Sequence, residues 1–188
     1  MYSQLDRIDA FIAGLDPAIQ EALTATTSRK IFGKGDYLLQ PGDVCRYSFL
    51  IESGLARKYY LTDGREVTTE LYFSQDLALS LTSYATQSPS REAIQALSNT
   101  VTSRTDYRAF QALKFRFPAL LELDLLLTEY HAMWLEERLM QFRTLDATQR
   151  YRLLVETQPH VVQSIQLTHI ASYLGVSLET LSRIRAKC

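Results

Sequence analysis

The spacing of apolar residues changes twice along the chain, and this limits the folds that the sequence can adopt. Residues 5–27 carry apolar side chains at helical spacing. Between Arg29 and Tyr107 the apolar residues recur at every second position, in short runs rich in β-branched and aromatic residues. From Tyr107 onward the helical spacing returns. A block of strands between two blocks of helices predicts an α+β fold.

Glycine, proline and aspartate, which are common in tight turns, separate the strand-like runs of this block. Asp63-Gly64 stands between two strand-like runs, which is the strongest short-range signal of a β-hairpin. Pro41-Gly42-Asp43 and Ser53-Gly54 separate other runs. Many short strands joined by such turns predict a small antiparallel β-barrel or jelly roll. The predicted strands cover residues 30–32, 37–39, 47–51, 56–61, 67–73, 93–97 and 101–103.

One of these runs shows the alternation of a half-buried strand. Successive side chains of a strand point to opposite faces of the sheet. One face would carry Val67, Thr69, Leu71 and Phe73, and the other Thr68, Glu70 and Tyr72. We therefore expect one face of this strand to be buried and the other to meet solvent.

The stretch from Ala119 to Leu145 contains no glycine or proline and predicts one long helix. At 1.5 Å per residue such a helix is roughly 40 Å long. Its apolar residues cover more than the single stripe that a helix with one buried face needs. We therefore expect it to meet two surfaces, its own barrel and a second copy of the chain in a homodimer. A helix buried inside a monomer is the alternative.

Helix-capping signals mark two further borders. Asp16-Pro17 predicts a break between two short helices, with Asp16 as the N-cap and Pro17 at the first helical position. Asp146, followed by Gln149, fits a capping box and predicts a new helix after Leu145. The chain then divides into a barrel domain of residues 1–117, a long helix of residues 118–145 and a C-terminal domain of residues 146–188.

The last 24 residues predict two short helices joined by a tight turn. The first helix has one apolar face, made by Leu167, Ile170, Ala171 and Leu174. Gly175 can take the left-handed conformation that ends this helix, and Ser177 is a suitable N-cap for the next. In the second helix Leu181 and Ile184 face inward. This is the layout of the helix-turn-helix motif, whose second helix enters the DNA major groove.

The outer face of the second helix carries groups that can read DNA. Arg183 can bond guanine O6 and N7, and Glu179, one turn away, can accept from cytosine N4. An αα-hairpin in a protein core, the alternative, would be apolar on both faces. Residues 146–188 carry a net charge of +2, although the whole chain carries −1. The predicted DNA contacts are Thr168, Ser177, Leu178, Glu179, Thr180, Ser182, Arg183 and Lys187.

These features together resemble the CRP/FNR family of bacterial transcription regulators. Leu174-Gly-Val-Ser-Leu-Glu-Thr-Leu-Ser-Arg-Ile is similar to the family's Gly-x-Ser-x-Glu-Thr-x-x-Arg recognition motif. Gly35, Pro41-Gly42-Asp43, Gly54 and Asp63-Gly64 stand at the family's turn positions. The resemblance covers residues 5–188. Leu178 replaces the first arginine of the motif in the best-known members.

The resemblance implies a cyclic-nucleotide-binding-like sensor barrel in residues 1–117 and a dimerisation helix in residues 118–145. It implies a winged-helix DNA-binding domain in residues 146–188, although we expect no wing hairpin, because few residues follow the second helix. It places Glu179 and Arg183 at base-contacting positions. The partners it implies are a second copy of the chain and double-stranded DNA, with RNA polymerase as a further candidate.

The effector position departs from the family pattern. Members that bind cyclic AMP resemble Gly-Glu, a short helix and Arg-Ser/Thr-Ala, where the glutamate holds the ribose hydroxyl and the arginine holds the phosphate. The matching stretch, Asp76 to Ala93, keeps Arg91 and Ala93 but has no Gly-Glu pair. Glu92 places a carboxylate beside the expected phosphate, which is unfavourable. We therefore predict that cyclic AMP is not the effector.

A more apolar ligand, or regulation without a ligand, fits this stretch better. The candidate effector-pocket residues are Leu79, Leu81, Thr82 and Arg91. Arg91 could equally be a surface residue. Because Leu77, Leu79 and Leu81 alternate with small residues, the stretch lacks the acceptor that a ribose hydroxyl needs.

Other chemistry has little support in the sequence. The three histidines all follow residue 130 and have no partner at ligand spacing, which argues against a metal-binding cupin enzyme. Cys45 and Cys188 form no Cys-x-x-Cys pair, so a disulfide framework and a zinc site are not indicated. Neither a signal peptide nor a bilayer-spanning apolar stretch is present.

We therefore predict a cytoplasmic DNA-binding regulator with no catalytic residues, no metal and no cofactor. The alternative is a barrel protein whose helical tail binds other proteins and never meets DNA. Salt dependence separates the two, because DNA binding weakens steeply as salt rises and an apolar protein interface does not.

Overall fold

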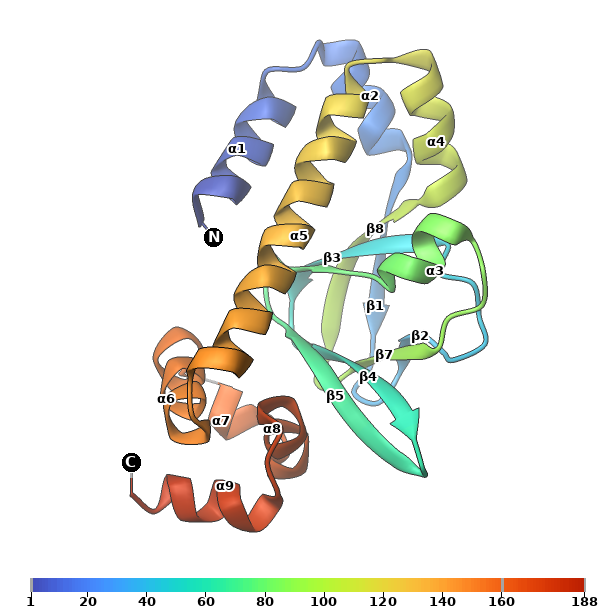
Figure 1. The fold of residues 1–188 in the computed structure, drawn as a ribbon. Coiled ribbons are helices and arrows are strands. Elements are labelled where there is room, and N and C mark those ends of the chain that lie inside the picture. The colour runs from blue at the N-terminus through green and yellow to red at the C-terminus, as the bar shows by residue number, and fades with distance from the viewer. Residues whose placement is uncertain (1, 160, 188) are drawn as a thin grey trace. The chain divides into compact units, whose positions relative to one another are not determined.

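The structure is a computed structural model that describes residues 2–159 and 161–187 (Figure 1). The chain forms two compact units. The first contains the chain up to Ser28 together with Thr105–Thr144, and the second contains Arg29–Arg104 together with the chain from Leu145 onward. Helices make up most of the first unit, and the second holds two sheets and further helices. The predicted α+β class is confirmed.

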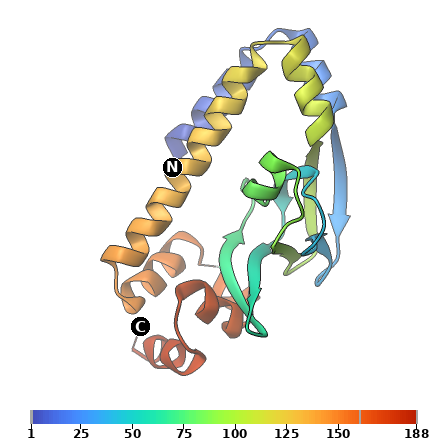
Figure 2. The same cartoon turned by 45° about the vertical axis from the view of Figure 1, so that its right-hand side comes forward.

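The first unit is built from α1 (Tyr2–Ala13), α2 (Pro17–Ala25), α4 (Tyr107–Arg116) and α5 (Leu120–Thr144). As predicted, Asp16 caps α2, accepting a hydrogen bond from the backbone N–H of Ala18, and Pro17 begins the helix. Asp106 caps α4 in the same way through Ala109. Figure 2 shows α1 lying along α5.

The long helix α5 extends over 25 residues, close to the predicted span. Its buried residues are Leu120, Leu123, Leu126 and Tyr130. They pack in one core with residues of α1 and α4 such as Ile8 and Phe110. The N-terminal helices and α4 therefore cover the buried face of α5. That α5 also meets the barrel stays a prediction.

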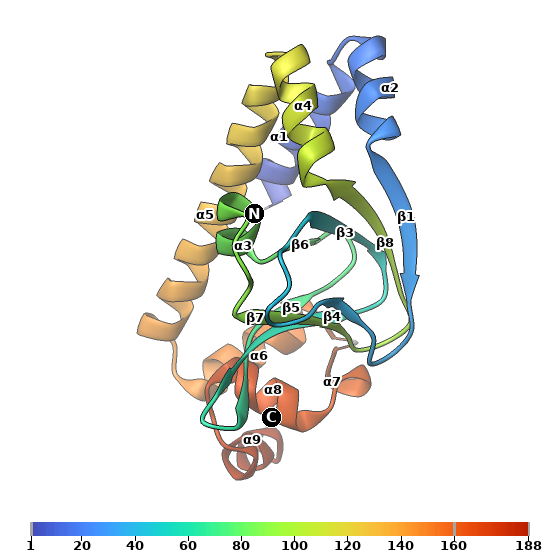
Figure 3. The ribbon, with the colours of Figure 1, turned by 90° about the vertical axis from the view of Figure 1, so that its right-hand side faces the viewer.

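The barrel of the second unit is an antiparallel jelly roll, as predicted, and Figure 3 shows its two layers. In the described part of the chain, one four-stranded sheet has the order β1 (Thr27–Phe32), β8 (Thr100–Asp106), β3 (Tyr47–Ser53) and β6 (Leu77–Ala78). The other has the order β2 (Tyr37–Leu39), β7 (Glu92–Ala96), β4 (Ala56–Thr62) and β5 (Arg65–Tyr72). The short helix α3 (Leu81–Thr86) follows β6.

Local turn chemistry and the apolar core explain this arrangement. Asp63 and Gly64 both have positive φ and form the two-residue turn between β4 and β5, so the predicted hairpin is confirmed. Phe32 and Phe49 from one sheet pack with Ile94 from the other in a single buried core. Burial of these side chains holds the two sheets together.

Strand β5 is buried on both faces along its second half. Tyr72 belongs to the barrel core, whereas Leu71 packs with the C-terminal helices. Near the hairpin Val67 is 43% exposed while Thr68 is buried. The predicted alternation of faces is confirmed. The expected solvent-exposed face is wrong for this half of the strand, because the C-terminal helices cover it.

The C-terminal helices are α6 (Ala147–Thr157), α7 (Val161–Ser164), α8 (Leu167–Leu174) and α9 (Leu178–Arg185). The predicted capping box is present at the start of α6. The Gln149 backbone N–H donates to Asp146 Oδ1 at 2.8 Å, and Gln149 Oε1 accepts from the Asp146 backbone N–H at 2.8 Å. The helices share one core with Leu71 and Leu97 of the barrel.

Helix α8 covers the free edge of β5. The Thr68 backbone N–H donates to Ser172 Oγ at 2.8 Å, and the Ser172 hydroxyl donates to the Glu66 carbonyl at 3.2 Å. Arg57 of β4 lies beside this contact, with Nη2 2.5 Å from Glu66 Oε2 and Nη1 2.9 Å from His169 Nδ1. Burial and the Arg57 charge lower the pKa of His169. The helix thus satisfies backbone groups that an open sheet edge would expose.

Candidate functional site

The turn between α8 and α9 has the geometry that the sequence predicts. Gly175 takes a left-handed conformation, with φ 69°. Its N–H donates to the Ser172 carbonyl at 3.1 Å, and the Val176 N–H donates to the Ala171 carbonyl at 3.0 Å. These two bonds form a Schellman motif, which ends a helix and turns the chain sharply. Helix α9 begins at Leu178, shortly after this turn.

Helix α9 is fixed at its start and anchored along its inner face. Ser177 Oγ accepts a hydrogen bond from the Thr180 backbone N–H at 3.2 Å, so the predicted N-cap is confirmed. Leu181 and Ile184 are buried, as predicted, in the core shared by the C-terminal helices. The opposite face of α9 is left to solvent. Hydrogen bonds from its own backbone N–H and from Ser177 lower the pKa of Glu179 on that face.

The residues that we predict to contact DNA lie on α9 or directly before and after it, except Thr168, which lies on α8. Seven of the eight are exposed: Thr168, Ser177, Leu178, Glu179, Ser182, Arg183 and Lys187. Thr180 is half-buried beneath the Ser177 cap. The surface therefore offers a carboxylate, a guanidinium, hydroxyls and an ammonium.

Not every cation of the basic C-terminal segment is available to a ligand. Arg150 donates from Nη2 to the Leu174 carbonyl at 3.0 Å and from Nη1 to the Leu145 carbonyl at 2.6 Å. It thus holds the end of α8 against the start of α6. Arg183, Arg185 and Lys187 are exposed.

The barrel interior contains a cluster of charges, Lys58, Glu70 and Glu92, that the sequence analysis missed. Lys58 Nζ lies 2.6 Å from Glu70 Oε1 and 3.5 Å from Glu92 Oε1. The three residues are 5%, 3% and 7% exposed respectively. The Tyr72 hydroxyl donates to Glu70 Oε2, and burial and the Glu70 charge raise the pKa of Tyr72. The cluster carries one positive and two negative charges.

Strand pairing brings these charges together. Lys58 and Glu70 are direct cross-strand partners on β4 and β5, and Glu92 on β7 pairs with Tyr60, two residues from Lys58. Opposite charges on facing residues of neighbouring strands stabilise a sheet. The only sequence signal for this cluster was the strand alternation, which places Glu70 between Thr68 and Tyr72 on one face.

Burial also shifts the pKa of a carboxylate next to this cluster, that of Asp76. Asp76, in the turn after β5, accepts a hydrogen bond from the Phe73 backbone N–H at 2.7 Å. Burial nevertheless raises the pKa of Asp76 to about 6, and the charge of Glu70 acts in the same direction. This part of the barrel is therefore already rich in negative charge.

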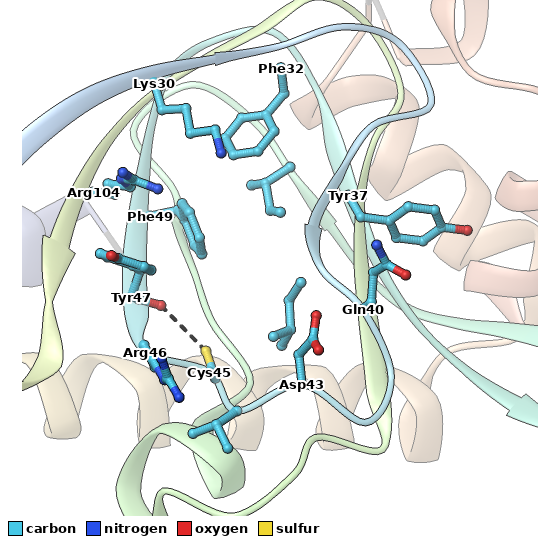
Figure 4. A pocket seen from close by; sticks show the side chains of 13 residues that line it. Lys30, Phe32, Tyr37, Gln40, Asp43, Cys45, Arg46, Tyr47, Phe49 and Arg104 are labelled. Carbon is cyan, nitrogen blue, oxygen red and sulfur yellow. Dashed lines mark hydrogen bonds between the residues drawn. The ribbon is translucent and has the colours of Figure 1, made fainter.

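A cavity of about 380 Å³ opens in the barrel (Figure 4). Its lining comes from β1, β2, the segment 40–46, β3 and Arg104 of β8. Cys45 is buried in its wall, and its thiol donates to the Tyr47 carbonyl at 3.3 Å. Burial raises the pKa of this thiol, which keeps it protonated and a poor nucleophile. Cys188 lies outside the residues that the structure describes.

No three histidine, cysteine or carboxylate side chains among the described residues are grouped so that they could hold a metal ion. No helix in residues 2–159 and 161–187 combines the length and the apolar character needed to cross a bilayer.

Comparison with protein families gives one match, to the barrel and the helix that follows it. Residues 29–116 match the family model described as the cyclic nucleotide-binding domain. This part of the chain is therefore similar to such a domain. The match covers the strands that hold Lys58, Glu70 and Glu92, as well as α3 and α4. A search of curated proteins found no match to the chain.

Solved structures extend the likeness to the rest of the chain. The catabolite activator protein of Thermus thermophilus is 21% identical, with a TM-score of 0.54, covering 94% of this chain and 85% of that one. FixK2 of Bradyrhizobium japonicum is 17% identical, with a TM-score of 0.67 and coverages of 86% and 83%.

A third structure, CLP of Xanthomonas campestris, is described as a global regulator responsive to c-di-GMP. It is 16% identical, with a TM-score of 0.61 and coverages of 92% and 91%. At these identities the likeness concerns the fold. The resemblance to CRP/FNR regulators that the sequence indicates is confirmed at that level.

The predicted effector residues do not line the cavity of Figure 4. Leu79 is buried in the barrel core. Leu81 and Thr82 begin α3 and are exposed, and Arg91 is exposed beside the buried Glu92. The lining of the cavity instead includes Lys30, Phe32 and Arg104. A role for the four residues in an effector pocket stays a prediction.

Proposed function

We propose that the chain is a sequence-specific DNA-binding transcription regulator that acts as a homodimer. The observation that carries this proposal is the outer face of α9. This face holds Glu179 and Arg183 in solvent while Leu181 and Ile184 fix the helix from behind. Such a helix after a glycine turn suits the DNA major groove. The regulatory names of the structural neighbours support the same reading.

The proposal assigns a role to each segment. Residues 1–117 serve as the sensor domain, residues 118–145 as the dimerisation helix and residues 146–188 as the DNA-binding domain. The protein works in the cytoplasm, where it meets its operator, with RNA polymerase as a further partner. It acts as a regulator and not as an enzyme.

Base reading by Arg183 gives the most direct test. Arg183→Ala should weaken binding to the preferred sequence by about 1–3 kcal/mol and relax the preference at one base pair of each half-site. Lys187→Ala, at a predicted phosphate contact, should weaken all sequences to a similar extent. Selection from a random DNA library, followed by titration of the selected duplex at several salt concentrations, measures both effects.

Two results would contradict DNA reading. If Arg183→Ala selects the same sequence with the same preference, the arginine does not read a base. If the unchanged chain binds DNA without a steep fall in affinity as salt rises, the basic surface does not neutralise phosphates. Absence of DNA binding by the unchanged chain even at low salt would favour a helical tail that binds other proteins.

The dimer part of the proposal rests on a regular exposed stripe along α5. Seven exposed positions are spaced alternately by four and three residues: Leu121, Leu125, Thr128, Ala132, Leu135, Leu139 and Phe142. This is the spacing of the contact positions in a two-stranded coiled coil. The stripe lies apart from the buried face of α5, so one helix can serve its own unit and a second copy of the chain.

Charges in the centre of this stripe should separate the dimer. The double variant Leu135→Glu and Leu139→Glu would place four carboxylates across a two-fold interface and should give a monomer in sedimentation equilibrium. Glu136→Gln, next to the stripe and exposed, is the matched control and should leave the dimer intact. A monomeric unchanged chain at tens of micromolar would contradict the dimer.

We also propose that cyclic AMP is not the effector. The matching stretch contributes Glu92 to a buried cluster that already contains Glu70 and carries a net negative charge. A phosphate in this place would meet two carboxylates and only one ammonium, which is already paired. Each charged hydrogen bond that cyclic AMP cannot form lowers its affinity roughly tenfold or more. Calorimetric titration with cyclic AMP should therefore show no saturable binding below about ten micromolar.

A further inference from the structure

One guanidinium links the residue that follows the long helix to the turn that precedes α9. Helix α5 ends at Thr144, and one border between the two compact units lies between Thr144 and Leu145. Arg150, in the first turn of α6, donates from Nη1 to the Leu145 carbonyl at 2.6 Å and from Nη2 to the Leu174 carbonyl at 3.0 Å. Leu174 is the last residue of α8 and directly precedes Gly175. Two points far apart in the sequence therefore share one side chain.

Both carbonyls lie where a helix ends and need a partner there. The last carbonyls of a helix have no N–H partner within it, and a cation beside them also meets the negative end of the helix dipole. Backbone N–H groups of the turn at Gly175 bond two other carbonyls of α8. Arg150 bonds the last carbonyl, that of Leu174. The same side chain bonds the first carbonyl after α5.

Capping and packing fix both ends of this link. Asp146 and Gln149 form the capping box that holds the start of α6. Leu174 is buried in one core with Tyr151 of α6 and with the inner face of α9. The guanidinium between them is planar and holds its donors in a fixed fork. The two carbonyls therefore cannot move apart while both hydrogen bonds are made.

A dimer that reads DNA has to hold its two α9 helices at one separation. The two half-sites of such a dimer have centres about 34–36 Å apart, one turn of DNA, or a multiple of it. One added base pair moves a half-site by about 3.4 Å and rotates it by about a tenth of a turn. To follow that change, α8 and α9 would have to shift relative to Leu145, where the chain leaves the dimerisation helix. The bonds of Arg150 oppose this shift.

We propose that Arg150 fixes the spacing between the two half-sites that a dimer of this protein reads. It is a positioning residue, which acts through the Leu145 and Leu174 carbonyls. The bases themselves are read by Glu179 and Arg183 on the outer face of α9. This inference rests on the proposed DNA-binding function and adds a second criterion for its operators. A wrong spacing costs the Arg150 bonds, so a chain without these bonds loses that part of the discrimination.

Duplexes with altered spacers test the inference. The unchanged chain first selects its preferred sequence from a random library, and the two half-sites are then placed one or two base pairs nearer or farther apart. The unchanged chain should bind the selected spacing most tightly. In Arg150→Met the ratio of affinities between selected and altered spacings should fall by about tenfold or more, the effect of one charged hydrogen bond. The base preference within each half-site should stay the same.

Two further variants separate this role from general destabilisation. Arg152→Met removes the same charge from an exposed position of the same helix and should keep the spacing preference. Arg150→Lys keeps a cation at the helix ends, so it should be more stable than Arg150→Met. Its spacing preference should nevertheless be relaxed, because one ammonium does not replace the fork. Circular dichroism shows which variants are folded, and Arg150→Lys decides the test if Arg150→Met does not fold.

The outcomes distinguish this inference from the function on which it rests. If the unchanged chain selects no DNA, the DNA-binding proposal fails and the role of Arg150 fails with it. If the unchanged chain binds DNA without a preferred spacing, or if the folded Arg150 variants keep a strict spacing, only the role of Arg150 is overturned. An altered base preference within the half-sites would also overturn it, as would an equal relaxation in Arg152→Met.

Discussion

Replacing Lys58 with methionine is expected to lower the free energy of unfolding by about 3–5 kcal/mol at pH 7. Lys58 is the ammonium that faces both Glu70 and Glu92 inside the barrel. Without it, two buried carboxylates would lie close together with no opposite charge from this residue. Removing one member of a buried ionic group costs far more than losing a surface pair, because the remaining charges stay out of water. Urea unfolding followed by circular dichroism measures the change.

Two further variants separate charge from volume in this experiment. Lys34→Met, at an exposed turn position, should change stability by less than about 0.5 kcal/mol. The triple variant Lys58→Met, Glu70→Gln and Glu92→Gln should recover much of the loss, since no buried charge of the cluster remains. If Lys58→Met and Lys34→Met are equally stable, the buried cluster does not contribute to the fold as described.

Gly54→Ala should destabilise the protein by about 3–5 kcal/mol, the sum of a strained backbone and an overpacked contact. Gly54 follows β3 with φ +97°, a conformation that L side chains rarely adopt. An added Cβ would lie 2.5 Å from the Asn99 carbonyl oxygen and 2.6 Å from the Thr100 Cα. Both obstacles are backbone atoms, which cannot move aside as a flexible side chain can.

Gly64→Ala is the matched control for this prediction. Gly64 also has a positive φ, +72°, but an added Cβ there would meet nothing within 4 Å. Its cost should be only the left-handed backbone strain, about 1–2 kcal/mol. The difference between the two variants in thermal or urea unfolding then measures the clash. Equal losses would show that the loop holding Asn99 and Thr100 can shift without cost.

Sequence reasoning succeeded where the cause of a structure is local. Asp16 and Asp146 cap helices through atoms only two or three residues away. The Asp63-Gly64 turn depends on the φ preferences of two neighbouring residues. The end of α8 at Gly175 likewise depends on one residue that tolerates a left-handed conformation. Such local signals do not depend on which distant segments pack around them.

The features that were missed depend on which distant segments become neighbours. Alternation placed Glu70 and Tyr72 on one face of a strand, but only the order β7-β4-β5 shows that Lys58 and Glu92 lie beside them. The partner of the buried α5 face could not be chosen from periodicity, because the N-terminal helices and the barrel both offer apolar surfaces. The cavity arises from segments as far apart as Lys30 and Arg104.

The second unit is made of two separate stretches of the chain, and this affects the protein while it is being synthesised. Its barrel part ends at Arg104, yet the helices that cover Leu71 and accept the Thr68 N–H come from the chain after Leu145. At about 5–20 residues per second, the ribosome needs several seconds to add the stretch between them. During that interval the growing chain carries an apolar patch and an open strand edge. A chaperone that shields such surfaces would meet this protein at that stage.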